Sequence, residues 1–315
     1  MTDLPERWWA RLGWALPFAV VVPMLALANA LGIHAIIFPE GAALVMGVWV
    51  LRLPGWAASR WRVAALPPLC ALAGTLIVRA QLPSWGAAIL GCAVALLVLQ
   101  SLDSRLAPAL SAAALPIVFD VPDWSYPLAV LVICLLISGA MPWLARRRGQ
   151  QTASPHDLPG RYPWAVAAAG LAAIAAWILL GGELLALPVA ALAPPLFVSA
   201  LEWLGQGTCT LRRGMRRWLL LVAVALAGAL AADLVDVTWI AGAIAIAAAL
   251  VLMWLLSAPH PPALAIALIP QILDTVAPLA YAAAIAVGAG ALYLAMLALD
   301  RFAGLTSATA TAGGP

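Results

Sequence analysis

The sequence is poor in charged residues. They make up 9% of its 315 residues, and hydrophobic residues make up 65%. Soluble domains carry about 25% charged residues. The mean hydropathy is +1.04. A chain with so little polar surface is not expected to fold in water, so we predict that its solvent and main partner is a lipid bilayer.

Lysine is absent, and all sixteen basic residues are arginine. The net charge of +3 is therefore set by arginines that fall in short clusters between apolar runs. This distribution does not indicate a nucleic-acid partner. The positions of the arginine clusters along the chain are instead informative about orientation in the membrane.

Cysteine is scarce, and its spacing excludes several kinds of site. Cys70, Cys92 and Cys134 lie inside apolar runs, and Cys209 lies in a basic loop. No cysteine has metal-ligand spacing. Phosphate-binding glycine loops and nucleophile motifs are also missing. The sequence thus predicts no disulfide framework, no metal site, no cofactor and no enzymatic activity.

Long apolar runs, split at proline, glycine and charge, predict an all-α polytopic membrane helix bundle of about twelve segments. Each half has six segments, some near the ~20 residues needed to cross hydrocarbon and others short or broken. They are 14–31, 36–53, 61–78, 85–102, 106–119 and 124–144, then 164–180, 184–201, 218–234, 239–256, 261–273 and 277–299. We predict a first membrane repeat over 1–145, a cytoplasmic linker over 146–162, a second repeat over 163–301 and a disordered tail over 302–315.

The two halves share uncommon residues at a constant separation of 154 positions. The pairs are Trp49 and Trp203, Gly74 and Gly228, Trp85 and Trp239, Pro108 and Pro262, Pro116 and Pro270, and Asp120 and Asp274. We interpret them as a tandem duplication. In both halves the second segment is broken by proline and the fifth is short. Such segments at matching positions indicate the central site of a transporter.

Arginine positions predict the orientation. With the N-terminus inside and six crossings per half, every arginine except Arg79 falls on the inner side. Both termini are then cytoplasmic, and the even number of crossings makes the repeats parallel. We expect a multi-pass protein of a bacterial inner membrane.

One stretch resembles a known family. His260-Pro261-Pro262-Ala263, followed by Leu-Ala-Ile-Ala-Leu-Ile, resembles the signature of the HPP family of integral membrane proteins. The resemblance covers roughly residues 164–300, and Leu106-Ala107-Pro108 would be its degenerate counterpart. The family's stretch usually continues with glycine, where this chain has Leu264, and its members are usually described with four helices per unit. Some relatives are associated with nitrite movement across membranes, which implies small-anion transport.

A weaker similarity is to the membrane domains of aromatic-acid and fusaric-acid exporters. It depends on Pro194-Pro195-Leu-Phe-Val-Ser-Ala-Leu-Glu202, followed by a basic loop and a leucine-rich helix. The pattern is loose, but it adds a second class of possible substrate.

The candidate site residues are polar groups and prolines near the short or broken segments. His260, Pro261 and Pro262 either restart a helix at the interface or direct its free N–H groups and the imidazole toward a central site. Glu40 lies in an apolar run, as a buried functional carboxyl or as a helix cap near the headgroups. The others are Glu202, a candidate ion-pair partner near the inner face, Asp120 and Asp274, which are turn residues or a paired outer site, and Arg105, near the inner mouth.

We therefore predict a secondary transporter or channel for a small solute, possibly an anion such as nitrite. The alternatives are an efflux module for aromatic acids, which needs a larger, aromatic-lined cavity, and a membrane scaffold that transports nothing. A homo-oligomer is compatible with each of these functions.

Overall fold

The chain is all-helical wherever the structure, a computed structural model, describes it. The described residues are 13–57, 59–147, 161–184, 193–205, 210–273 and 277–303. Strands are absent from these ranges, as the apolar runs predict. Most of the predicted linker and the tail lie outside them, so the proposed domain boundaries stay predictions.

The first half runs from α2 to α8. Its elements are α2 (Leu16–Leu31), η1 (His34–Ile36), α3 (Glu40–Val45), the π-helical η2 (Met46–Val50), α4 (Pro54–Ala57), α5 (Arg60–Arg79), α6 (Ser84–Ser101), α7 (Pro108–Val118) and α8 (Ser125–Arg147). The second half comprises α9 (Trp164–Ile178), the π-helical η4 (Leu179–Leu184), α10 (Pro194–Gly205), α11 (Leu211–Leu234), α12 (Thr238–Leu255), α13 (Pro262–Leu268), η6 (Ile269–Gln271) and α14 (Pro278–Ala303).

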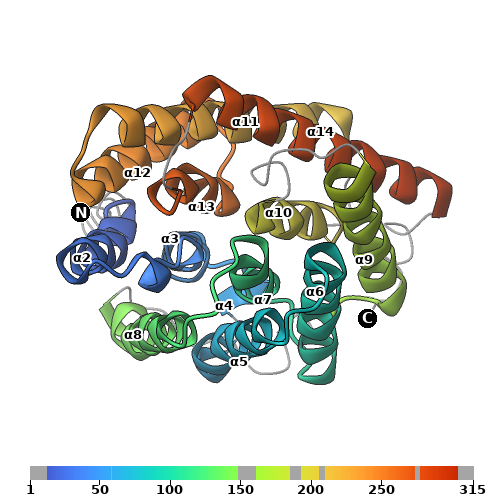
Figure 1. Cartoon of the computed structure of the whole chain (residues 1–315), viewed down its shortest axis with the longest axis horizontal. Coiled ribbons are helices and arrows are strands. Elements are labelled where there is room, and N and C mark those ends of the chain that lie inside the picture. The colour runs from blue at the N-terminus through green and yellow to red at the C-terminus, as the bar shows by residue number, and fades with distance from the viewer. Residues whose placement is uncertain are drawn as a thin grey trace, which may run out of the picture.

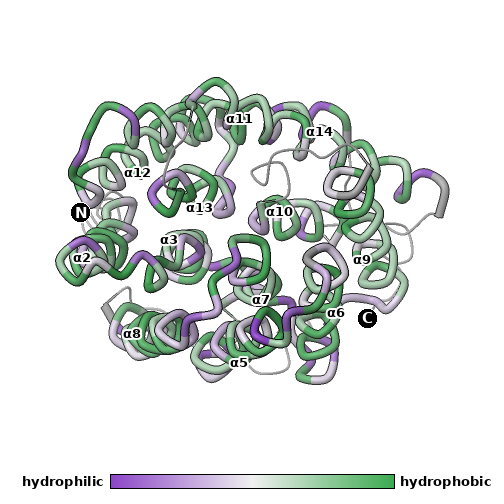
Figure 2. Tube along the Cα trace, in the orientation of Figure 1, coloured by the Kyte–Doolittle hydropathy of each residue, from purple (hydrophilic) through white to green (hydrophobic). Residues whose placement is uncertain are grey.

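Within the described ranges, six helices are long and apolar enough to cross a membrane. They span Arg60–Arg79, Ser125–Arg146, Trp164–Gly182, Leu211–Leu234, Thr238–Leu255 and Pro278–Arg301. Their outward faces carry exposed leucines such as Leu128 and Leu294, and hydrophobic colour covers most of their length (Figure 2). Helices suit this environment because each satisfies its own backbone hydrogen bonds where no water is available. The protein is an integral membrane protein with several crossings.

Four short helices lie at the centre of the molecule, inside a ring of longer ones (Figure 1). They are α3, α7, α10 and α13, and all residues of α3 and α13 are buried, as are the first ten of α7. The last three begin with proline, which costs no hydrogen bond at that position, and α3 begins directly after Pro39. The predicted short and broken segments thus form the core.

The two halves contain the same elements at nearly constant spacing. Helices α6 and α12 begin and end 154 positions apart, as do the turns that follow them. Asp103 and Ser257 hold the left-handed φ values 54° and 47° at these turns. The next amides, of Ser104 and Ala258, donate to Leu99 and Met253 in the same pattern.

The halves are interleaved around the centre. Helix α2 packs against α12 of the other half, and its counterpart α9 packs against α6. Likewise α3 packs against α13, and α10 packs against α7. Figure 1 shows corresponding helices on opposite sides of the centre, with α5 opposite α11 and α8 opposite α14. A half-turn about the viewing direction therefore approximately exchanges the halves.

Candidate functional site

The His-Pro-Pro stretch forms the beginning of α13. Pro261 is the N-cap and Pro262 the first helical residue, so neither missing N–H interrupts a hydrogen bond. The His260 carbonyl accepts a bond from Ala263 N at 3.0 Å. His260 is only 2% exposed, so its side chain is enclosed by the protein, and its position relative to the membrane interface stays a prediction.

Ser199 joins His260 to a third helix. Its hydroxyl, on α10, lies 2.6 Å from His260 Nε2 and is also hydrogen-bonded to the Tyr293 hydroxyl on α14. All three side chains are buried. Trp203 packs edge-on against the Tyr293 ring with 4.8 Å between centroids. The imidazole of His260, the hydroxyl of Ser199 and the phenol of Tyr293 thus form a buried hydrogen-bond network that can hold or pass a proton.

A second group of polar residues adjoins this hydrogen-bond network. Glu202 is 8% exposed, and Arg217 of α11 is close enough to act electrostatically on Glu202, His260 and Tyr293. The role of Glu202 as an interfacial ion-pair partner stays a prediction, and the structure shows a buried carboxyl with Arg217 close enough to act on it. Burial raises the pKa of the nearby Tyr162 phenol, and the negative charge of Glu202 raises it further.

The first half has a different buried carboxyl. Glu40 is the first residue of α3, is 1% exposed and accepts a hydrogen bond on Oε1 from the Ser111 hydroxyl of α7. Its other oxygen, Oε2, is buried and meets no hydrogen-bond partner among the described residues. Glu40 therefore lies buried among the central helices. A carboxyl so placed can take up a proton or a small cation.

The remaining predicted site residues lie elsewhere. Arg105 is half-buried, donates from Nε to the Arg161 carbonyl at 3.2 Å and lies 5.7 Å from the centroid of the Tyr162 ring. Asp120 is exposed in the turn after α7, with φ at 50°. Asp274 lies outside the described residues, so the paired outer site is untested. The structure thus brings His260 near Glu202 but does not join either to Asp120.

Sequence reasoning missed Ser111, Ser199, Tyr293 and Arg217. The only local signal was a lone hydroxyl in an apolar run, at Ser111 in α7 and at Ser199 in α10. Their partners lie 61 to 94 positions away along the chain, so no local pattern identifies them.

A cleft of about 490 Å³ runs between α11 and α14, and Tyr293 of the hydrogen-bond network lies in its wall. Gly214 and Gly290 make room for it, and Trp203, Trp218 and Tyr293 contribute aromatic rings to its wall. Leu294 at its edge is 64% exposed, so the cleft opens on the apolar circumference of the helix bundle.

Comparison with known proteins bears on the same region. Residues 220–302 match the family model described as "HPP, transmembrane region". This part of the chain is therefore similar to the transmembrane region of the HPP family. No curated protein and no solved structure matches the chain. The matched residues, hereafter the HPP region, are fewer than the expected 164–300.

The HPP region contains two of the three linked side chains, His260 and Tyr293, and all of α12 and α13. Ser199 and Glu202 come from α10, before the match begins. The buried polar site is therefore completed by a helix outside the HPP region, and Glu40 and Ser111 lie entirely in the other half.

Replacing Ser199 by alanine is expected to lower the unfolding temperature in detergent. The substitution leaves His260 and Tyr293 without their shared partner, and a buried unsatisfied polar group costs about 1–3 kcal/mol. Ser138→Ala is the control, because that hydroxyl donates only to Leu135 O of its own helix. Equal melting temperatures for the two variants would contradict the proposed linkage.

Proposed function

We propose that the protein is a secondary transporter or channel for a small solute, with an anion such as nitrite as the first candidate. One observation carries this proposal: the four central helices, buried in an apolar bundle, bear Glu40 with Ser111 and His260 with Ser199. Ionisable residues inside a membrane bundle are costly, and they mark ion and solute pathways in membrane proteins.

The proposal includes two parallel repeats and twelve crossings in a bacterial inner membrane, with both termini in the cytoplasm. The spacing of 154 positions and the half-turn relation between the halves support a tandem duplication with parallel copies. The contact of Arg105 with Arg161 and the position of Arg217 support an arginine-rich inner side. The outer side would carry Asp120 and Asp236.

Uptake by the purified full chain in proteoliposomes tests the proposal. We expect labelled or fluorescently reported nitrite to enter protein-containing vesicles faster than vesicles without protein. His260→Ala should slow this uptake more than Asp236→Asn, because Asp236 is exposed in the turn before α12. Nitrite uptake no faster than in empty vesicles would remove nitrite as a substrate, and the same result for all small anions tested would remove the anion proposal.

Efflux of an aromatic acid is the second candidate, and the cleft between α11 and α14 favours it. Its volume of about 490 Å³ lies within the ~300–1,000 Å³ of ligand pockets, and three aromatic side chains contribute to its wall. Benzoate added to the same vesicles discriminates between the candidates. Benzoate movement that Ala291→Trp blocks would favour efflux through this cleft, whereas no movement of either solute would favour the scaffold alternative.

A further inference from the structure

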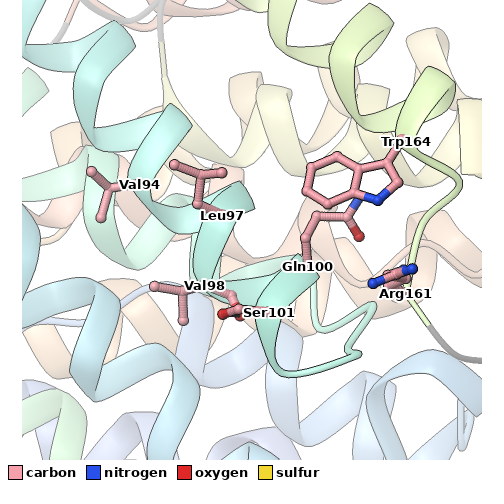
Figure 3. Close-up of a pocket in the computed structure, with 7 residues that line it drawn as sticks. All are labelled: Val94, Leu97, Val98, Gln100, Ser101, Arg161 and Trp164. Carbon is pink, nitrogen blue, oxygen red and sulfur yellow. Dashed lines mark hydrogen bonds between the residues drawn. The ribbon is translucent and has the colours of Figure 1, made fainter.

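A second pocket, of about 410 Å³, lies where the two halves of the chain meet, between α6 and the beginning of α9 (Figure 3). One side is apolar, formed by Val94, Leu97 and Val98 along α6. Leu97 is 59% exposed, so this side continues onto the apolar outer surface. The pocket therefore has a wall suited to an acyl chain.

The other end of the pocket is polar. Figure 3 shows Gln100 between α6 and the side chains of Arg161 and Trp164, which precede and begin α9. The Arg161 guanidinium lies 5.8 Å from the centroid of the Trp164 ring. Arginine and tryptophan together at a helix end are typical of the membrane–water interface, where lipid headgroups lie.

Gln100 shows that this end is built to receive a hydrogen-bond donor. The side chain is 2% exposed, and its Nε2 donates to the Tyr162 carbonyl at 3.0 Å, which fixes the amide. Its Oε1 is buried and has no hydrogen-bond partner within the described ranges. A buried acceptor left unsatisfied costs about 1–3 kcal/mol, so a ligand that donates to it gains that amount.

The local charge favours an anion. Arg105 lies beside Arg161, since its Nε donates to the Arg161 carbonyl at 3.2 Å. One carboxylate, Asp103, accepts from the Arg161 backbone N–H at 3.2 Å. Arg161 itself lines the pocket, and a second arginine and one carboxylate contact its backbone, so basic groups outnumber acidic ones at this end.

We propose that this pocket binds an anionic phospholipid with a hydroxyl-bearing headgroup, of which phosphatidylglycerol is the simplest. The phosphate pairs with Arg161, a headgroup hydroxyl donates to Gln100 Oε1, and one acyl chain lies along Val94, Leu97 and Val98. Basic pockets between membrane helices bind anionic headgroups in this way. The bound lipid contacts both α6 and α9 and so connects the two halves.

Gln100 and Ser101 have apolar residues at the corresponding positions of the other half, which gives an internal comparison. Positions 154 residues after Gln100 and Ser101 are Trp254 and Leu255, which are 72% and 62% exposed. At the related surface of α12 these apolar side chains replace the amide and the hydroxyl. The asymmetry predicts one specific lipid per chain.

Native mass spectrometry of the full chain, with defined lipids added, tests this proposal. We expect phosphatidylglycerol to be retained and phosphatidylcholine to be lost. Phosphatidylmethanol, which keeps the charge and lacks headgroup hydroxyls, should bind more weakly than phosphatidylglycerol. Arg161→Gln should weaken phosphatidylglycerol binding about fivefold, the effect of one arginine near a headgroup, and Arg60→Gln should leave it unchanged.

Two further measurements test whether the acyl chain contributes to binding, or whether the headgroup and surface charge are sufficient. Leu97→Trp, which fills the apolar side, should reduce retention, whereas Leu90→Trp on the same helix should not. Glycerol phosphate should bind far more weakly than the lipid. Equal retention of phosphatidylcholine, an Arg161→Gln effect no larger than that of Arg60→Gln, or equal binding of glycerol phosphate would each overturn the proposal.

Discussion

Gly228→Ala is expected to lower the stability of the protein strongly, because the added methyl would clash with the backbone of another helix. A Cβ at Gly228 would lie 2.1 Å from the Ala267 carbonyl oxygen, where α11 meets α13. That atom is backbone and cannot rotate away, so the two helices must separate. Overpacking of this kind costs about 1–3 kcal/mol, and a contact this close to backbone falls at the upper end.

Gly74→Ala provides the same experiment in the first half. A Cβ there would also lie 2.1 Å from a carbonyl oxygen, that of Ala113 in α7. Both substitutions should lower the thermal unfolding midpoint in detergent. The control is Gly139→Ala in α8, where a Cβ meets nothing within 4 Å. Alanine is about 1 kcal/mol better than glycine in a helix, so a midpoint for Gly139→Ala as low as the others would refute the packing argument.

Glu40→Gln is expected to abolish accumulation driven by a pH gradient, if the protein transports a solute as proposed. One pH unit is worth about 1.4 kcal/mol per proton, which supports roughly tenfold accumulation. Glutamine keeps the shape of Glu40 and can still accept the Ser111 hydrogen bond, but it cannot exchange a proton. The accumulation ratio in proteoliposomes should therefore fall from about ten to about one.

Equilibrium exchange distinguishes a variant that has lost only proton coupling from a variant that is misfolded and inactive. With equal solute concentrations on both sides, labelled solute should still cross through Glu40→Gln, because the pathway is intact. Asp236→Asn, which removes an exposed carboxylate, should preserve both activities. Full gradient-driven accumulation by Glu40→Gln would show that the protein transports the solute but that Glu40 does not carry the coupled proton.

Sequence alone predicted the helical bundle and its short or broken central segments, for reasons that are local. Proline fixes where α7 and α13 begin, at Pro108 and Pro262, and apolar composition identifies the long helices. The partners within the site are not local. Helices buried on every side have no polar face to give their rotation, so nothing in the sequence places Ser199 between His260 and Tyr293.

The same reason explains why Glu40 was ambiguous. A carboxyl beside a proline in an apolar run can cap a helix at the headgroups or lie within the bundle, and both give the same sequence. The packing of α3 against α7 and α13, which makes Glu40 1% exposed, is a property of the fold that the sequence does not contain.

The interleaving of the halves has the form of an isologous dimer interface. In a two-fold dimer, if one element contacts another across the interface, the reverse contact also occurs. Here α2 contacts α12 while α9 contacts α6. A single half would therefore present complete self-complementary surfaces to a second copy. Under the proposed duplication, the two copies in one polypeptide need not stay identical: Glu40 corresponds in position to Pro194 and His260 to Leu106, so each half carries its own buried polar residues.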